Sequence, residues 1–230
     1  MAQPAELYNT KSDFAYTVVR EKILSGEFAP GQVLNQATLA RTIGISTTPL
    51  REALRRLKSE NLVDLDAHRD ARVTELTAEE ARDLLELRRS LDPLAAALAA
   101  ERRTKADIKD IRDAANVEPL RHGFGVEELE THRRFHRAIY RASHNDLLIG
   151  TLDGLWDKAD RYRRVGLVGE HGHEERDRKA DEHRRLVDCV VAGDTEGAAA
   201  VMHRHISTSL GARAATRLGA TPVSTPRAPR

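Results

Sequence analysis

Two histidines, His132 and His136, stand four residues apart in the stretch THRRFH and are the first candidates for chemistry in this chain. On a helix, residues four apart share a face at about 5–6 Å, close enough to bind one metal ion. A zinc protease would need glutamate directly after the first histidine, as the general base of an H-E-x-x-H motif. The chain has Arg133 there, so the pattern indicates a metal site or a pair of core histidines.

Two further histidines, His183 and His205, occur in later segments with helical periodicity. At about 100° per residue, all four histidines fall among the apolar positions of their segments and so face inward. A single inward histidine is usually a hydrogen-bonded core residue, but four neutral imidazoles suit a divalent metal. We therefore predict a centre for Zn²⁺, with Ni²⁺ or Mn²⁺ as alternatives. The predicted ligands are His132, His136, His183 and His205.

The composition favours helices packed on helices. Of the 230 residues, 32% are charged and only 4% are aromatic, so much of the core must be leucine, valine, isoleucine and alanine. No apolar run approaches the roughly 20 residues that span a bilayer, and no signal peptide is visible. We expect a cytoplasmic protein with no membrane partner. Because the net charge is only +1, any DNA-binding surface must be local.

Four regions differ in pattern, and together they predict a mainly α fold. Residues 12–76 combine short helical patterns with a β-like end, whereas 77–215 are almost wholly helical and indicate an antiparallel bundle of about six helices. The N-terminal residues 1–11 are expected to be flexible and the tail 216–230 to be disordered. The last helix is predicted over 194–214. One stripe at helical spacing is predicted to face the core: Leu84, Leu87, Leu91, Leu94 and Leu98.

The segment STTPLREALRRLKSEN, which begins at Ser46, has the features of a DNA-reading helix. Its leucines fall on one helical face, whereas Thr48, Arg51 and Arg55 fall on the opposite face. Arginine can bridge O6 and N7 of guanine, and hydroxyls at a helix N-terminus can hold phosphates. A charge pattern alone would also fit a solvated face. The preceding LARTIGI and the following LVDLDAHRDARVTEL, readable as strand, loop and strand, favour a winged helix-turn-helix.

The stretches ILSGEFAPGQVL, LARTIGISTTPLREALRRL and LVDL resemble the winged-helix domain of GntR-type bacterial transcription regulators. The resemblance implies that the start of the reading helix contacts double-stranded DNA, assisted by the tip of the wing. Many members carry arginine at the position of Thr47, so the operator sequence cannot be transferred from them. Residue pattern and resemblance together give the predicted DNA-binding set: Ser46, Thr47, Thr48, Arg51, Arg55, His68 and Arg69.

The later stretches LLELRRSLDPLAAALAA, FHRAIYRASHN and EHRRLVDCVVAGDTEGAAAVMHRHI resemble the FCD effector domain of the FadR-like branch. FCD domains commonly hold a metal with one acidic residue and three histidines. The resemblance matches the histidines at His136, His183 and His205. The acidic position, three residues before the phenylalanine, is His132 here. The site is therefore either a four-histidine centre or a three-histidine centre beside an unbound His132.

The resemblance also implies a small organic acid as effector, because FCD domains bind such acids with a metal and basic side chains. Two arginines, Arg88 and Arg163, flank apolar stripes in the helical region and could each make a paired contact with a carboxylate. Either could instead extend to water or pair with an acid of the bundle. We predict these two residues as the effector-binding side chains.

These patterns predict a transcription regulator rather than an enzyme, since no catalytic constellation is visible. We expect a repressor that binds a near-palindromic operator as a homodimer and responds to an organic acid held with a metal. The alternative is a metal sensor, in which the ion itself is the signal. In that case metal alone would switch DNA binding.

Overall fold

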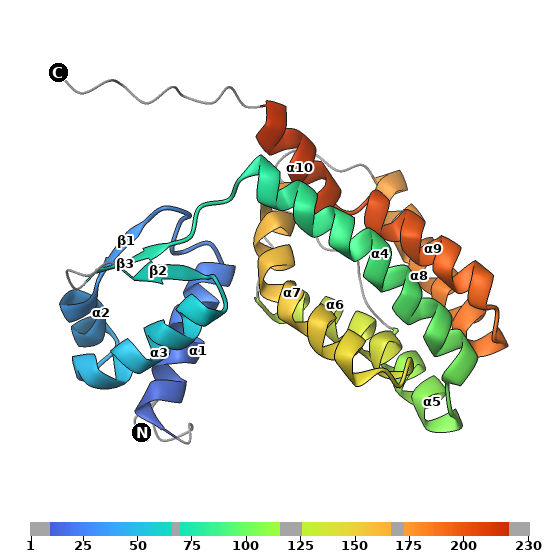
Figure 1. Ribbon diagram of the computed structural model, residues 1–230, viewed down its shortest axis with the longest axis horizontal. Coiled ribbons are helices and arrows are strands. Elements are labelled where there is room, and N and C mark those ends of the chain that lie inside the picture. The colour runs from blue at the N-terminus through green and yellow to red at the C-terminus, as the bar shows by residue number, and fades with distance from the viewer. Residues whose placement is uncertain (1–9, 66–69, 116–125, 167–172, 221–230) are drawn as a thin grey trace. The chain divides into compact units, whose positions relative to one another are not determined.

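The computed structural model (Figure 1) describes the following residues: 10–65, 70–115, 126–166 and 173–220. The chain forms two compact units, Met1–Leu76 and Thr77–Arg230, and each has its own hydrophobic core. The fold is mainly α, as predicted, with one small sheet in the N-terminal unit. Among the described residues, no helix is both long enough and apolar enough to cross a bilayer.

The described part of the N-terminal unit contains three helices and three strands: α1 (Lys11–Leu24), β1 (Val33–Asn35), α2 (Gln36–Thr42), α3 (Thr47–Ser59), β2 (Val63–Leu65) and β3 (Asp70–Val73). The strands form an antiparallel sheet in the order β1-β3-β2, with Val63 opposite Val73. The two predicted wing strands are present, and β1 joins them as a third strand that the sequence did not reveal. The unit is a winged helix-turn-helix, as predicted.

Local sequence explains where the first helices begin and turn. Thr10 caps α1 by accepting a hydrogen bond from the N–H of Asp13, and Asn35 caps α2 by accepting one from Thr38. Between α2 and α3, Gly44 has a φ of 75°, a left-handed conformation that glycine adopts without strain. This turn lets α3 follow α2 and pack against it.

The second unit is a helical bundle: α4 (Ala78–Arg102), α5 (Lys105–Ala114), α6 (Val126–Arg141), α7 (Asp146–Gly166), α8 (His173–Ala192), α9 (Thr195–Ser207) and α10 (Leu210–Ala220). The long helix α4 lies at its centre, in contact with α6, α7, α8, α9 and α10. Four alanines of α4 are fully buried, and their small size lets neighbouring helices approach closely. They are Ala95, Ala96, Ala99 and Ala100.

The predicted single helix over 194–214 is wrong, because it divides into α9 and α10 at Thr208 and Ser209. The Thr208 hydroxyl donates to the carbonyl of Arg204 at the end of α9, and the Ser209 hydroxyl accepts from the N–H of Ala212 at the start of α10. These hydroxyls satisfy backbone groups that a continuous helix would bond internally. The described bundle therefore has seven helices instead of about six.

The expected ends of the ordered chain also need correction. α10 continues to Ala220, where a disordered tail was expected from residue 216, because its buried Ala214 and Ala215 anchor it and it packs against α4 and α7. At the other end, α1 already begins at Lys11. The remaining residues of the predicted flexible N-terminus and disordered tail, 1–9 and 221–230, lie outside the described residues.

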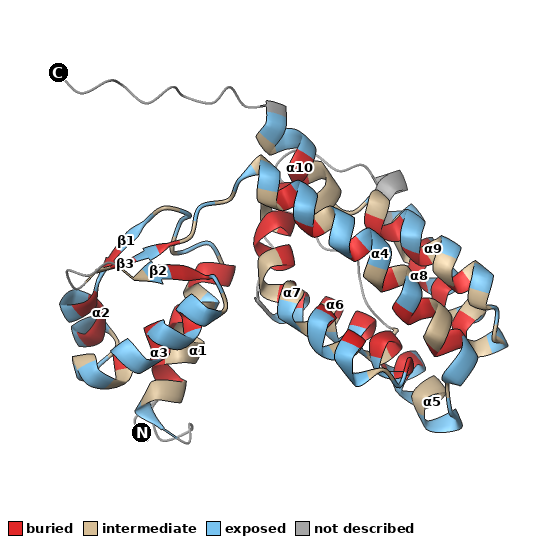
Figure 2. Ribbon diagram, in the orientation of Figure 1, coloured by how far each residue is buried: buried red, intermediate tan, exposed pale blue. Residues whose placement is uncertain are grey.

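The predicted leucine stripe of α4 is only partly buried. Leu84 is buried, but Leu87 and Leu94 are 50% and 46% exposed. Figure 2 shows exposed positions recurring along α4 beside its buried face. The buried face is rotated by about 100° from the predicted one, because alanines and two charged residues occupy the positions against the neighbouring helices. Its members include Ala81, Leu84, Arg88, Asp92, Ala95 and Ala99.

Candidate metal centre and DNA-reading helix

Helix α3 turns its apolar residues inward, as its spacing predicts. Leu50, Leu54 and Leu57 are fully buried in the core of the N-terminal unit, and Ala53 is almost fully buried. The polar residues therefore occupy the opposite face of the same helix (Figure 2). The predicted DNA-binding residues at α3 lie as follows: Ser46, Thr48, Arg51 and Arg55 are exposed, and Thr47 is half-buried.

The start of α3 is open to a ligand. Ser46 is the N-cap residue, but its side chain makes no capping hydrogen bond. Its hydroxyl and the first backbone N–H groups of the helix are thus available to a phosphate oxygen. The two predicted wing residues, His68 and Arg69, lie outside the described residues.

Two arginines of α3 have different roles. Arg51 is exposed, and its Nε donates a hydrogen bond of 3.2 Å to Oε1 of the buried Gln36 on α2. The other guanidinium nitrogens of Arg51 have no partner among the described side chains. In contrast, the guanidinium of Arg56 lies 3.7 Å from the ring centre of Tyr16, whose hydroxyl donates to Glu60. Arg56 thus stabilises the unit, which the sequence did not reveal.

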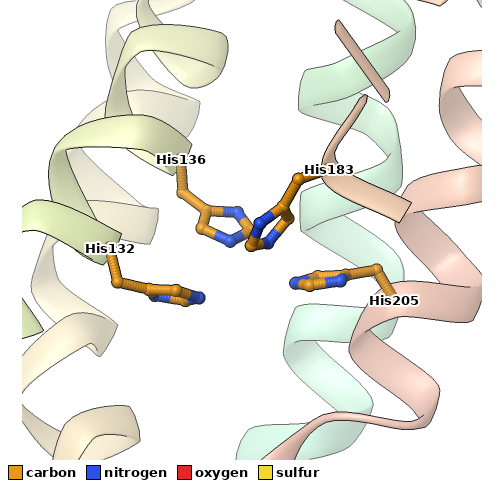
Figure 3. Close-up of side chains that lie close together, drawn as sticks. All are labelled: His132, His136, His183 and His205. Atoms are coloured by element: carbon orange, nitrogen blue, oxygen red, sulfur yellow. The ribbon is translucent and has the colours of Figure 1, made fainter. Parts of the chain in front are cut away.

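In the bundle, the four predicted metal ligands come together from three helices. His132 and His136 lie on α6, His183 on α8 and His205 on α9, and Figure 3 shows their rings converging on one point. The ring centres are 4.7 Å apart for His132 and His136, and 4.8 Å apart for His183 and His205. One ligand nitrogen from each residue lies within 4.8 Å of the others. His132, which the sequence left open, is part of the group.

All four histidines are buried, and several of their nitrogens are unsatisfied. Both ring nitrogens of His136 and of His183, and Nδ1 of His132, have no hydrogen-bond partner among the described residues. Burial lowers the pKa of His136 well below its usual value, and the neighbouring His132 lowers it further. Burial likewise lowers the pKa of His132, followed by the positive charge of Arg163. The imidazoles are therefore neutral near pH 7, the state in which they bind metals.

The donor set fits a divalent metal ion. A Zn–N distance of about 2.1 Å places any two ligand nitrogens of a tetrahedral site roughly 3.4 Å apart. Nitrogens within 4.8 Å of one another reach such positions by small ring rotations. An unsatisfied buried polar atom costs about 1–3 kcal/mol. A metal would bind one nitrogen of each ring and remove much of that cost, so the cluster could hold an ion.

Glu182 and Lys179 of α8 support the centre from outside. Nδ1 of His205 donates to Oε2 of Glu182 over 3.0 Å, which turns the other ring nitrogen of His205 toward the cluster. Lys179 donates to the same carboxylate and to the hydroxyl of Thr208 where α9 ends. Burial opposes the charge on Glu182, but hydrogen bonds from His205 and Lys179 lower its pKa to about 2. This arrangement fixes the orientation of a ligand.

Arg88, a predicted effector residue, is buried beside the histidines. Its guanidinium pairs with Asp92 over 2.7 Å, and the hydroxyl of Tyr140 donates to the same carboxylate over 2.6 Å. Burial opposes the charge on Arg88, but the carboxylate of Asp92 outweighs it and raises the pKa of Arg88. Arg88 therefore pairs with an acid of the bundle, one of the two possibilities left by the sequence.

Arg163, the second predicted effector residue, is also buried and ion-paired. It pairs with Asp160, which Arg133 contacts over 2.6 Å. Burial, followed by the like charge of Arg88, lowers the pKa of Arg163 to about 10 despite Asp160. Trp156 connects this group with the histidines: Arg163 lies 4.4 Å and His136 5.5 Å from its ring. Both arginines thus lie over Trp156, whose ring also contacts the histidines.

A helix with an exposed polar face in one unit and a buried cluster of histidines and arginines in the other define a class of protein. It is the one-component regulator, in which a single chain binds DNA and holds a ligand. Comparison with known families agrees. Residues 11–73 match the model "Bacterial regulatory proteins, gntR family", and residues 83–208 match the FCD domain. The chain belongs to the GntR family of bacterial transcription regulators and has the FadR-like FCD architecture.

Individual relatives have the same organisation. The chain is 29% identical to the HTH-type transcriptional regulator YdhC of Bacillus subtilis over 187 residues, 80% of this chain and 82% of YdhC. It is 27% identical to the HTH-type transcriptional repressor GlaR of Escherichia coli over 202 residues, 85% of this chain and 92% of GlaR. The structure of E. coli McbR/YncC has the same fold, with a TM-score of 0.68 and 22% identity, covering 85% of this chain and 93% of that one. The protein is a DNA-binding transcription regulator and not an enzyme, as predicted.

Proposed function

We propose that the protein is a repressor whose affinity for a near-palindromic operator changes when a metal ion and a small organic acid bind in the bundle. The observation that carries this proposal is the buried four-histidine cluster, with unsatisfied nitrogens, next to two buried arginines. A neutral, ready-made ligand set of this kind has no use in holding helices together. Apolar residues would stabilise the same interior better.

The proposed DNA contacts begin at the N-terminus of α3. Ser46, Thr47 and Thr48 would hold phosphates, because they surround the open helix end. Arg51 and Arg55 would reach base edges in the major groove, since both project from the exposed face. We propose His68 and Arg69 as additional contacts from the wing, on the resemblance alone.

The proposed effector is a carboxylic acid that completes the coordination of the metal. His132, His136, His183 and His205 would hold the ion, Zn²⁺ in the first place, and the ion would supply a Lewis-acidic position for a carboxylate oxygen. Arg88 and Arg163 would bind the remaining oxygens, because both lie over Trp156 beside the histidines. Each would then share its guanidinium between the effector and its aspartate.

We propose a homodimer formed through α4. Leu87 and Leu94 lie seven residues apart on one face of this helix, and each leaves about half of its side chain exposed. Exposed leucines at heptad spacing are typical of a helix-packing seam. A second copy related by a twofold axis would cover them and would present two reading helices to a near-palindromic operator.

The repressor assignment draws on GlaR, which is described as a transcriptional repressor. Repression requires only that the protein bind its operator until the effector changes the affinity. Because its target is the bacterial chromosome, we place the protein in the cytoplasm.

A second candidate function is metal sensing, favoured by the completeness of the histidine cluster. If four protein ligands already satisfy the ion, no organic acid is needed, and the ion itself would be the signal. The two functions differ in what switches DNA binding.

Fluorescence anisotropy with an operator selected from random duplexes separates these functions. We expect that Zn²⁺ with a dicarboxylate changes the affinity of the full-length protein for that duplex, whereas Zn²⁺ alone changes it little. A full response to Zn²⁺ alone would favour the metal sensor. If neither treatment changes the affinity, the proposed effector response is wrong.

A further inference from the structure

The buried charges of the bundle already balance without a metal. Among the described residues of the bundle, the buried carboxylates are Asp92, Asp160 and Glu182, and the buried guanidinium groups are Arg88, Arg161 and Arg163. These described buried groups thus carry three negative and three positive charges. An ion that enters this interior finds no surplus negative charge among the buried side chains.

Each buried carboxylate is also committed to a cation that contacts it directly. Asp92 pairs with Arg88, and Asp160 pairs with Arg163 and Arg133. Glu182 pairs with Lys179 over 2.8 Å and accepts a hydrogen bond from Nδ1 of His205. None of them is free to neutralise a metal without leaving its own partner unpaired, which is costly inside a protein.

The ligands themselves contribute no negative charge. All four members of the cluster are imidazoles, and no carboxylate is among the described side chains that form it. A divalent ion bound there would keep its full charge of about +2 in a space where the four rings are at most 8% exposed. Charge in such an interior is strongly disfavoured unless a counter-charge accompanies it.

We propose that the metal ion and a dianionic small organic acid enter this centre as a pair, so that each binds weakly without the other. This inference rests on the proposed metal site and adds the charge of the effector and the rule that couples it to the ion. A dianion cancels the charge of the ion in one molecule, whereas a monocarboxylate leaves half of it. By linkage, the factor by which the acid raises metal affinity equals the factor by which the metal raises acid affinity.

His132 gives the decisive variants. His132→Asp would place one negative charge in the ligand set, and His132→Asn provides the same shape without that charge. With Asp the centre should bind metal more tightly without an acid and depend less on the acid. With Asn it should stay weak without acid and keep the dependence. Only the charge at this position differs between the two variants.

The experiment is equilibrium dialysis of the full-length protein at free Zn²⁺ concentrations fixed by a chelator buffer, with bound zinc measured by elemental analysis. Oxalate, malonate and succinate are compared with acetate and chloride at equal ionic strength. We expect at least one dicarboxylate to raise zinc affinity of the wild type by roughly 5- to 150-fold, the usual range for coupled sites. Acetate should raise it less, and the enhancement should shrink in His132→Asp but not in His132→Asn.

The outcomes are distinguishable. Equal zinc affinity with and without every dicarboxylate, an equal effect of acetate, or an equal response of the two variants would overturn the pairing. Absence of bound zinc under all conditions, including His132→Asp, would overturn the metal site itself. If the variants fail to fold, calorimetric titration of the wild type with the dicarboxylate, with and without Zn²⁺, tests the same linkage. A dicarboxylate affinity that is the same with and without Zn²⁺ would contradict the proposed linkage.

Discussion

The two units of this chain differ in where the proposed functional side chains lie: on the exposed face of a helix in the N-terminal unit and on the buried faces of helices in the bundle. On α3, Arg51 and Arg55 are exposed above a layer of buried leucines. On α6, His132 and His136 point inward among buried aromatic residues such as Phe135. Both helices are strongly amphipathic, but the polar side is functional in the first and the buried side in the second.

This difference decides what each site depends on. The exposed face of α3 belongs to one helix and, as proposed, would meet DNA from outside. The histidine cluster exists only where α6, α8 and α9 pack together. A substitution of Arg51 or Arg55 on α3 should therefore alter binding and leave folding unchanged, whereas one in the cluster should alter the ion and the packing together.

The largest effect should come from the exposed apolar face of the bundle. Burying the exposed half of a leucine contributes about 1 kcal/mol, so four leucines of a symmetric dimer contribute about 4 kcal/mol. Replacing Leu87 and Leu94 together with serine should thus raise the dimer dissociation constant on the order of 1000-fold, measured by sedimentation. Leu147→Ser is the control, since Leu147 is 86% exposed on α7. An unchanged dimer would remove α4 from the interface.

A comparably large effect is expected at the ligands. Structural zinc sites bind with roughly 10–16 kcal/mol, so one of four ligands contributes about 2.5–4 kcal/mol, on the order of 100-fold in affinity. His205→Ala should therefore lose its zinc in elemental analysis after dialysis. The matched control is His203→Ala, because His203 is exposed on the same helix. If both variants retain one ion per chain, the ligand set is wrong.

A smaller loss of zinc affinity is expected when Glu182, which contacts the ligand His205, is replaced. Glu182→Gln removes the charge that orients His205, and such outer partners typically change metal affinity by 10–100-fold. The neighbouring Asp181→Asn is the control, because Asp181 pairs with Arg184 at the surface. Zinc affinity by chelator competition should fall only in the first variant. Equal affinities would show that Glu182 has no influence on the centre.

The smallest and most selective effect is expected on α3. Arg51→Ala should cost about 1–3 kcal/mol of specific operator binding while thermal unfolding of the protein stays unchanged. Arg204→Ala removes the same charge from an exposed site on α9 and should leave operator affinity unaltered. Anisotropy titrations of both variants test this. If the losses are equal, the effect is one of net charge and not of base contact.

The features that the sequence predicted correctly are those decided within one helix. The inward face of α3 followed from the spacing of Leu50, Leu54 and Leu57, and the inward position of each histidine followed from its apolar neighbours. The histidine cluster could be predicted because it required only that several such faces meet in one core. Its members did not depend on the exact register between helices.

The missed features depend on how helices meet. The contact of Glu182 with His205 joins α8 to α9, and that of Tyr140 with Asp92 joins α6 to α4. Neither contact can be predicted from the local sequence, because the two residues of each pair lie on different helices and the sequence does not show how those helices are aligned. The helical spacing of Leu87 and Leu94 predicts that they face the core. Instead, the small alanines of α4 pack against the neighbouring helices, and the two leucines are about half exposed. The spacing of apolar residues shows that a helix has a buried face, whereas packing against the neighbouring helices decides which of two adjacent faces is buried.

The hydrogen bond from Arg51 to the buried Gln36 has a consequence for the speed and fidelity of reading. Immobilising a long side chain on binding costs up to about 2 kcal/mol of rotamer entropy. Gln36 restrains the guanidinium through Nε alone, and the two terminal nitrogens have no partner among the described side chains, so they could bind a guanine. If Arg51 reads a base as proposed, a guanidinium restrained in this way should discriminate against other bases, because it cannot reorient freely to meet them.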